Sequence, residues 1–258
     1  MAISEQQIQS ALKQIIDPTT GKDYISTQSV RNIQIDQQHV SIDIELGYPA
    51  NSVKQAIQKQ ITDALHAIPG IEKIQVSVNS KIIPHSAQRG VKLIPGVKNI
   101  IAVASGKGGV GKSATAVNLA LALSAEGASV GILDADIYGP SQPQMLGITQ
   151  HPDSLDGKTM EPVMAHGIQA MSIGLLIDVE TPMVWRGPMV TQALQQLLND
   201  TNWKDLDYLV VDLPPGTGDI QLTLAQKIPV TGAVIVTTPQ DIALLDARKG
   251  LKMFEKVG

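Results

Sequence analysis

The sequence of 258 residues contains no cysteine. Within these residues, its absence excludes disulfides, cysteine nucleophiles, thiolate zinc sites and cysteine-ligated iron–sulfur clusters. Aromatic residues are scarce, with two Trp, four Tyr and one Phe, which argues against a stacking platform for single-stranded nucleic acid. Basic residues number 20 against 24 acidic ones, so no broad basic surface is available for a phosphate backbone. We therefore expect no nucleic-acid partner.

Membrane and export signals are also missing. The most apolar of the long uncharged stretches, residues 162–177, is shorter than the ~20 residues of a membrane helix and includes His166 and Gln169. We interpret it as a loop and a buried strand. The N-terminus has neither the basic start nor the apolar core of a secretory signal. These observations predict a cytoplasmic protein with no membrane partner.

The first third of the chain has the periodicity of a small mixed domain. Helical and period-two spacing of apolar residues succeed one another, and Ser4 with Gln7 has the spacing of a capping box. The order helix, strand, strand, helix, strand predicts an α+β domain over residues 1–82, with its first two strands antiparallel. The five segments are residues 4–16, 30–35, 40–46, 53–68 and 74–78.

The rest of the chain follows a different pattern. Residues 83–97 lack a sustained period and contain Pro84 and Pro95, which predicts a linker. Over residues 98–258, short continuous apolar runs alternate with helix-like segments, as is typical of an α/β domain with a mostly parallel sheet flanked by helices. The apolar runs are residues 100–104, 130–133, 208–211 and 233–236, and the helical segments are 113–125, 189–198, 222–228 and 242–257.

A phosphate-binding loop is predicted where the first of these apolar runs meets the first helix. The sequence GKGGVGKS over residues 106–113 has the G-x-x-x-x-G-K-[ST] spacing in a strand-loop-helix setting. Glycines let backbone amides converge on phosphate oxygens, Lys112 is expected to neutralise the outer phosphates, and Ser113 is expected to hold magnesium. The residues expected to bind ATP are Gly106, Lys107, Gly108, Gly109, Val110, Gly111, Lys112 and Ser113.

Acidic residues end two other predicted strands. Asp212 follows the run 208–211, from which position a carboxylate can orient the magnesium shell. Asp134 and Asp136 follow the run 130–133, where two carboxylates can position a water or a metal. Capping of the next helix or turn is the structural alternative for such a residue. The nearby phosphate loop favours the functional interpretation for Asp212 and Asp136.

Longer motifs resemble a known family. The loop resembles the deviant Walker A motif of MinD/ParA-type ATPases, which implies that Lys107 reaches the partner's nucleotide across a homodimer. Four further motifs resemble the Mrp/ApbC family of ATP-dependent iron–sulfur cluster carriers, and the N-terminal part resembles the iron–sulfur-assembly domain often fused to it. These motifs are LDADIYGPS at 133–141, VWRGP at 184–188, DLPPGTGD at 212–219 and TTPQDIALLDA at 237–247.

The resemblance implies an ATP hydrolase that carries clusters to apoproteins and meets iron–sulfur assembly proteins. It implies Lys107, Lys112 and Asp136 as catalytic residues, Ser113 and Asp212 at magnesium, and Asp219 in a switch segment with Asp212. The pair Trp185 and Arg186 belongs to a motif, but a Trp–Arg pair is more typical of local packing.

The chain also departs from its family. Family members continue beyond a segment like residues 254–258. They have a further strand, an asparagine motif that helps to bind adenine, and a Cys-x-x-Cys pair that binds a bridging cluster. This sequence contains neither that adenine-binding motif nor any cysteine ligand. We therefore expect a fragment that lacks the C-terminal part of the ATPase domain, with a natural short form as the alternative. Two other functions stay open: a positioning or partitioning ATPase like MinD and ParA, and a cluster-free nucleotide switch or adaptor.

Overall fold

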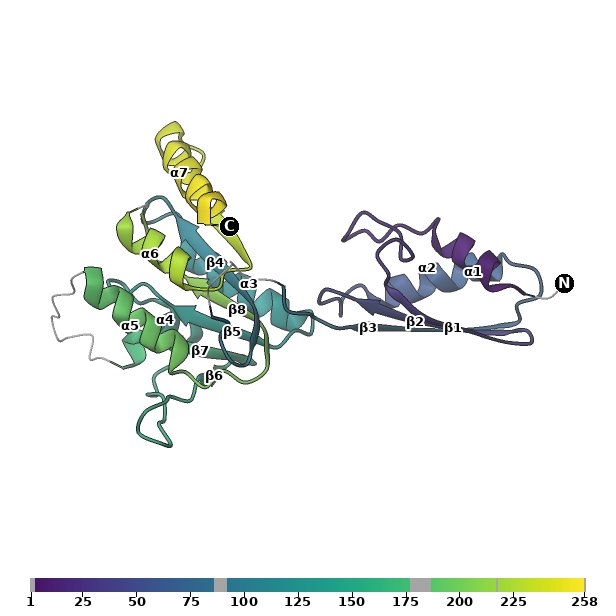
Figure 1. Ribbon diagram of the computed structural model, residues 1–258, viewed down its shortest axis with the longest axis horizontal. Helices are drawn as coiled ribbons and strands as arrows, with labels where there is room; N and C mark the ends of the chain where they lie inside the picture. Colours follow the sequence, from purple (N-terminus) through teal and green to yellow (C-terminus); the bar gives the residue numbers. More distant parts are fainter. Residues whose placement is uncertain (1–2, 86–91, 177–186, 217, 258) are drawn as a thin grey trace. The chain divides into compact units, whose positions relative to one another are not determined.

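The computed structural model describes residues 3–85, 92–176, 187–216 and 218–257 (Figure 1). The chain separates into two compact units, Met1–Ile83 and Pro84–Gly258, which are described one at a time. The elements of the small unit are α1 (Glu5–Leu12), β1 (Val30–Asp36), β2 (His39–Leu46), α2 (Lys54–His66) and β3 (Lys73–Ser80). Those of the large unit are β4 (Val97–Ser105), α3 (Lys112–Ala125), β5 (Val130–Asp134), α4 (Gln142–Leu146), β6 (Val163–Ala165), β7 (Ile168–Ser172), the 3-10 helix η1 (Ile173–Leu175), α5 (Gly187–Asn199), β8 (Leu206–Asp212), α6 (Asp219–Lys227), β9 (Gly232–Val236) and α7 (Asp241–Val257).

The small unit is a three-stranded sheet with helices on one face (Figure 1). β1 and β2 are antiparallel, as predicted, and β3 returns through α2 to lie parallel to β2. Alternate residues of β2, namely Val40, Ile42 and Ile44, are buried in the core with the apolar residues of α1 and α2. The residues between them, such as Ser41 and Asp43, face away from this core.

Helix α1 is shorter than its sequence pattern predicts. The capping box forms: the Ser4 hydroxyl accepts from the Gln7 backbone N–H, and the Gln7 side chain accepts from the Ser4 N–H. The helix ends at Leu12 rather than near Ile16. Proline disfavours helical geometry in the residue before it, and Asp17 precedes Pro18. The chain therefore leaves the helix before this pair, and Ile16 is left half exposed.

The large unit has the mostly parallel sheet that the apolar runs predict. Its six strands lie in the order β6-β7-β5-β8-β4-β9, and every pairing is parallel except that of β6 with β7. Both faces are covered: residues such as Leu133, Leu209 and Val211 are buried with the apolar faces of α5 and α6, whereas Ile132 and Val210 are buried with that of α3. Strands covered on both faces need apolar residues throughout, which explains the continuous runs of β4, β5 and β8. The run in β9, the edge strand, is different, because Gly232, Ala233 and Val234 are exposed.

The antiparallel strand β6 was not predicted. It pairs with β7 through the turn at His166 and Gly167, whose φ angles are 48° and 80°. β7 is fully buried and corresponds to the strand predicted within residues 162–177. A strand of three residues is too short to show a period in the sequence.

The topology gathers the ends of the predicted strands at one edge. β5, β8 and β4 are neighbours, and Asp134 at the end of β5 lies opposite Asp212 at the end of β8. Asp212 in turn lies opposite Val103, two residues before β4 gives way to the glycine-rich loop. Among the described helices, none combines the length and the apolar character that crossing a bilayer requires.

Candidate functional site

The glycine-rich loop joins β4 to α3, and three of its glycines, Gly108, Gly109 and Gly111, border open space. Gly109 and Gly111 have φ angles of 76° and 88°, in the left-handed region that favours glycine. Gly111 is also the N-cap of α3. A Cβ atom built on Gly108, Gly109 or Gly111 would meet no atom within 4 Å. The loop therefore leaves room for a ligand at the positive end of a helix, which favours an anion such as phosphate.

A cavity of about 240 Å³ adjoins the loop. Its lining includes two buried hydroxyl groups, those of Ser105 and Ser141, which have no hydrogen-bond partner among the described residues. Buried polar atoms in proteins normally have partners, so these hydroxyls mark the wall as one suited to a polar ligand. Besides loop glycines and Ala114, the lining consists of Ser105, Lys112, Ser113, Asp136, Ser141, Met145 and Pro215.

Lys112 is the cation of this cavity, and only 6% of the residue is exposed. Its ammonium group forms an ion pair with a carboxylate oxygen of Asp212, donates to the Ser113 hydroxyl at 3.2 Å, and lies 3.9 Å from a carboxylate oxygen of Asp136. Asp212 itself is fully buried. Ser113 and Asp212, which the sequence assigns to magnesium, and Asp136, which it assigns to catalysis, thus lie around the ammonium group of Lys112.

Asp136 lies closest to the open part of the cavity among these carboxylates, with 13% of its side chain exposed. Burial raises the pKa of Asp136 above its ordinary value, and the positive charge of Lys112 opposes this rise. A carboxylate that keeps a cation nearby and borders a cavity can accept a hydrogen bond from a water in that cavity.

Asp134 makes the kind of structural contacts that the sequence left as the alternative for an acid at the end of a strand. Its fully buried carboxylate accepts hydrogen bonds from the backbone N–H groups of Asp136, Ser141 and Gln142 at 2.9–3.1 Å, and from the Ser172 hydroxyl at 3.2 Å. Burial raises the pKa of Asp134 to about 6, the backbone N–H of Gln142 opposes the rise, and the charge of Asp212 adds to it. Asp134 therefore fixes the segment that carries Asp136.

Two residues at the start of the loop lie in contrasting surroundings. Lys107 is exposed, makes no ion pair with any described residue, and is not part of the cavity lining. Gly106, in contrast, packs against α7: a Cβ atom there would lie 2.6 Å from the Cβ atom of Asp246 and 3.1 Å from the backbone nitrogen of Ala247. Only glycine permits this close approach of loop and helix.

Three motif residues cannot be placed in the site. Trp185 and Arg186 lie outside the described residues. Asp219 begins α6, and its side chain lies outside the described part of the chain.

Gln142 is a site residue that the sequence analysis missed. It is 1% exposed, and its side-chain amide donates to the backbone carbonyl of Ser113 at 3.0 Å and to a carboxylate oxygen of Asp212 at 2.9 Å. The only sequence signal was its position directly after the motif at residues 133–141. A glutamine in that position does not by itself indicate buried hydrogen bonds to a distant strand.

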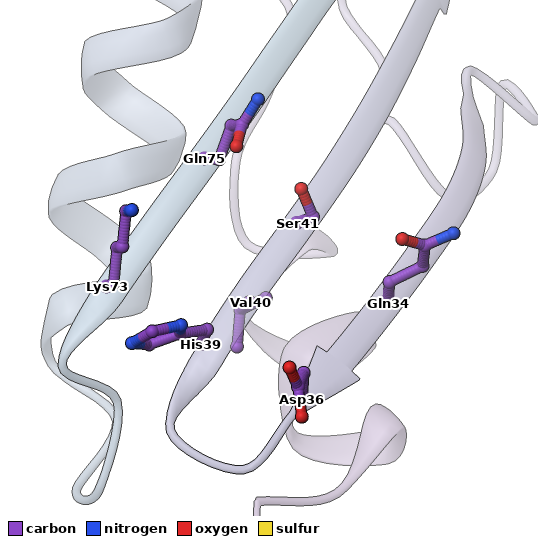
Figure 2. Close-up of a pocket in the computed structure, with 7 residues that line it drawn as sticks. All are labelled: Gln34, Asp36, His39, Val40, Ser41, Lys73 and Gln75. Carbon is purple, nitrogen blue, oxygen red and sulfur yellow. The ribbon is translucent and has the colours of Figure 1, made fainter.

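A second, smaller cavity of about 140 Å³ lies on the small unit, at the end of its sheet where β1 turns into β2 (Figure 2). Asp36, His39 and Lys73 reach it from neighbouring strands, and all three residues are exposed. Charged groups in contact with solvent need no ligand, so we do not assign this cavity a function. In the described residues, no group of three or more His, Asp or Glu side chains is placed to hold a metal ion.

Comparisons with known proteins cover both units. The family model for the NUBPL iron-transfer P-loop NTPase matches residues 96–258, and that for an iron–sulfur cluster assembly protein matches residues 5–78. The "iron-sulfur cluster carrier protein" of Haemophilus influenzae is 51% identical over 99% of this chain and 70% of its own length. The protein of the same name from Pseudomonas fragi is 63% identical over 75% of this chain and 68% of its own.

A solved structure resembles the large unit. It is a nucleotide-binding protein from Archaeoglobus fulgidus in complex with ADP, 39% identical to this chain, with a TM-score of 0.55 and coverage of 63% of each chain. Together with the two relatives, it shows that this chain spans about two thirds of the length of similar proteins.

Proposed function

The chain belongs to the family of NUBPL-type iron-transfer P-loop NTPases, and from this premise we propose that it binds and hydrolyses ATP to drive the transfer of iron–sulfur clusters to apoproteins. One observation supports ATP binding and hydrolysis above all: Lys112, Ser113 and Asp136 line one cavity beside the glycine-rich loop. The transfer of iron–sulfur clusters is supported by the two relatives, both of which are named iron-sulfur cluster carrier protein.

The reaction proposed is a phosphoryl transfer to water. The water oxygen bonds to the terminal phosphorus of ATP, the bond between that phosphorus and the bridging oxygen breaks, and ADP leaves with that oxygen, while the protein supplies position and charge. The loop amides and the N-terminus of α3 hold the phosphates. Lys112, which pairs here with Asp212, exchanges this partner for the outer phosphates, because its flexible ammonium group can donate to either. Asp136, 3.9 Å from Lys112, orients the attacking water and accepts its proton.

The residues present fit a magnesium ion. Mg²⁺ prefers hard oxygen ligands and usually keeps several waters, so it needs only a few protein groups. Ser113 lines the cavity, and the ammonium group of Lys112 contacts both the Ser113 hydroxyl and the Asp212 carboxylate. Ser113 would hold the ion directly and Asp212 would hold its waters. When bound, magnesium neutralises the charge that develops on the phosphate oxygens.

Lys107 has a separate role in the proposal. It is exposed and does not line its own cavity, so a contribution to the nucleotide of a second subunit suits its position. We propose a homodimer in which each Lys107 stabilises the charge on the partner's phosphates, as the deviant loop sequence implies. A cytoplasmic location and contact with iron–sulfur assembly proteins stay predictions of the sequence.

The cluster itself is the cargo, and these 258 residues do not fit it. They contain no cysteine, and in the part of the chain that the structure describes, no three His, Asp or Glu side chains are grouped so that they could bind a metal ion instead. The proposal therefore assigns this chain the nucleotide-driven part of the carrier cycle and derives no step at the cluster. Reconstitution with iron and sulfide should leave this chain without the absorbance of a cysteine-ligated cluster.

The experiment that tests the proposal compares Lys107→Ala with a matched surface variant, Lys158→Ala. Both lysines are exposed, but only Lys107 belongs to the phosphate loop. We expect Lys107→Ala to bind ATP like the unmodified chain and to lose magnesium-dependent hydrolysis, while Lys158→Ala keeps both. Equal hydrolysis by both variants would exclude the role across the dimer, and absence of ATP binding by the unmodified chain would exclude the proposed function.

A further inference from the structure

Gln142 connects three parts of the large unit through one buried side chain. It is the first residue of α4, and its backbone N–H donates to Asp134 at the end of β5. Its amide nitrogen donates to the carbonyl of Ser113 at 3.0 Å, in the first turn of α3, and to Asp212 at 2.9 Å, at the end of β8. The residue is 1% exposed, so water does not replace these bonds.

The chemistry of the partners fixes the orientation of the amide. Both side-chain contacts are acceptors, one a carbonyl oxygen and one a carboxylate oxygen, so only the NH₂ end of the glutamine can face them. Its two N–H groups are then fully used. The Oε1 atom is buried and has no hydrogen-bond partner among the described residues. The position of the side chain therefore satisfies Ser113 and Asp212 but leaves one of its own polar atoms unsatisfied.

The two oxygens of Asp212 consequently have different partners. Oδ2 accepts from the amide of Gln142, whereas Oδ1 accepts from the ammonium group of Lys112. Lys112 can move to a phosphate, but the amide of Gln142 is held by Ser113 at the same time as by Asp212. Departure of Lys112 thus frees Oδ1 alone, on the side of Asp212 that faces the phosphate loop.

We infer that Gln142 is a positioning residue of the nucleotide site: it holds Oδ2 of Asp212 against the start of α3, so that Oδ1 is presented to the hydrated magnesium ion. The inference rests on the proposed function and adds a residue to it. Because the backbone of Gln142 is bound to Asp134, which also holds the backbone N–H of Asp136, the same residue couples the two acidic segments of the site.

Gln142→Met tests this role, since methionine has a similar length and no amide. The matched control is Gln169→Met, because Gln169 is also buried and its amide makes two hydrogen bonds, to the backbone carbonyl and N–H of Lys204, outside the cavity lining. Binding of a fluorescent ATP analogue is titrated with magnesium and with EDTA, hydrolysis is measured against magnesium concentration, and thermal unfolding of each variant is recorded.

We expect Gln142→Met to need about tenfold more magnesium for half-maximal nucleotide binding and hydrolysis, the loss expected for one hydrogen bond to a charged group. Nucleotide affinity in EDTA should stay within about twofold, because the loop and Lys112 are unchanged. Gln169→Met should keep the magnesium dependence of the unmodified chain even where its melting temperature falls.

Gln142→Glu provides a second variant of the same shape. It replaces the N–H donor by a carboxylate that cannot donate to Asp212 when ionised, and should therefore change the magnesium requirement as well. Magnesium curves of both Gln142 variants that coincide with that of the unmodified chain would overturn the inference and leave the proposed function standing. Failure of the unmodified chain to bind nucleotide with magnesium would overturn both.

Discussion

Each unit buries a carboxylate, and the partners of the two carboxylates differ. In the small unit, Asp17 is 2% exposed and accepts hydrogen bonds from the Thr19 backbone N–H, the Thr20 hydroxyl and the Tyr48 hydroxyl at 2.8–3.0 Å. All three donors are neutral groups of the same unit. Such a carboxylate stabilises a loop, because each donor would lose a partner if it moved.

In the large unit, Asp212 is also fully buried, but one of its partners is the ammonium group of Lys112 beside a cavity. A lysine on a flexible stem can transfer its hydrogen bonds to another anion, whereas a backbone N–H cannot. Under the proposed function, the mobility of the partner, rather than the burial of the carboxylate, therefore separates Asp212 from the structural Asp17. Four predictions can break or sharpen this contrast.

The largest effect is expected for Lys112→Ala. Removal of the ammonium group eliminates its charge-assisted hydrogen bonds to phosphate and should weaken ATP binding by at least about a hundredfold, or about 3 kcal/mol. Calorimetric titration with ATP and magnesium measures the change. Retention of tight binding would show that the cavity beside the loop is not the nucleotide site.

The next effect concerns pH and Asp134. Its folded pKa of about 6 lies above the ordinary 3.8, so the folded state holds the proton more tightly than the unfolded state. The resulting stabilisation is complete below about pH 4 and is lost as the pH rises through about 6, with a change of up to about 3 kcal/mol. Asp134→Asn cannot titrate and should lack this slope.

Urea unfolding between pH 4 and 7 checks this prediction. Both tryptophans belong to the large unit, and Trp203 is buried there, so tryptophan fluorescence reports the unfolding of that unit. The difference in the free energy of unfolding between the unmodified chain and Asp134→Asn should change with pH. A constant difference would mean that Asp134 is ionised throughout this range.

Asp17→Ala is expected to act on stability alone. It leaves three donors without their acceptor and should lower the free energy of unfolding of the small unit by about 3 kcal/mol, whereas Tyr48→Phe, which removes one of the bonds, should lower it by about 1 kcal/mol. Hydrogen exchange of the β2 amides measures both. A loss of ATP affinity in either variant would contradict the assignment of Asp17 to structure.

The smallest effect is expected for Lys98→Met. Lys98 pairs with Asp207 at 2.7 Å, but 42% of its side chain is exposed, and such pairs contribute roughly 0–1 kcal/mol. We expect fluorescence-detected unfolding to change by no more than this and ATP binding to be unchanged. A larger change in the free energy of unfolding would show that this exposed ion pair stabilises the fold as strongly as a buried one.

The sequence predicted those parts of the fold and site that depend on neighbouring residues. The capping box at Ser4 and Gln7, the antiparallel pair and the covered parallel sheet are confirmed. They follow from local hydrogen bonding and from the period of apolar residues, both of which are visible within a few positions. The loop glycines and Lys112 likewise lie within eight residues of one another, over 106–113.

The contacts that the sequence did not predict join distant positions. Gln142 donates to Ser113 and Asp212, which are 29 and 70 positions away along the chain, so no local pattern contains the bond. The role of Asp134 depends in the same way on how the segment up to Gln142 folds back on its carboxylate. Spacing predicted an acid at a strand end, but only the fold decides which donors reach it.

At Gly106 the phosphate loop packs directly against helix α7. The α-carbon of Gly106 has no room for even one further atom before the backbone of α7 at Asp246 and Ala247, so no compressible layer of side chains separates loop and helix there. A shift of the loop toward α7 must displace the helix by a similar amount. Ile242 and Leu245, both largely exposed on α7, would move with any such shift, because they belong to the same helix.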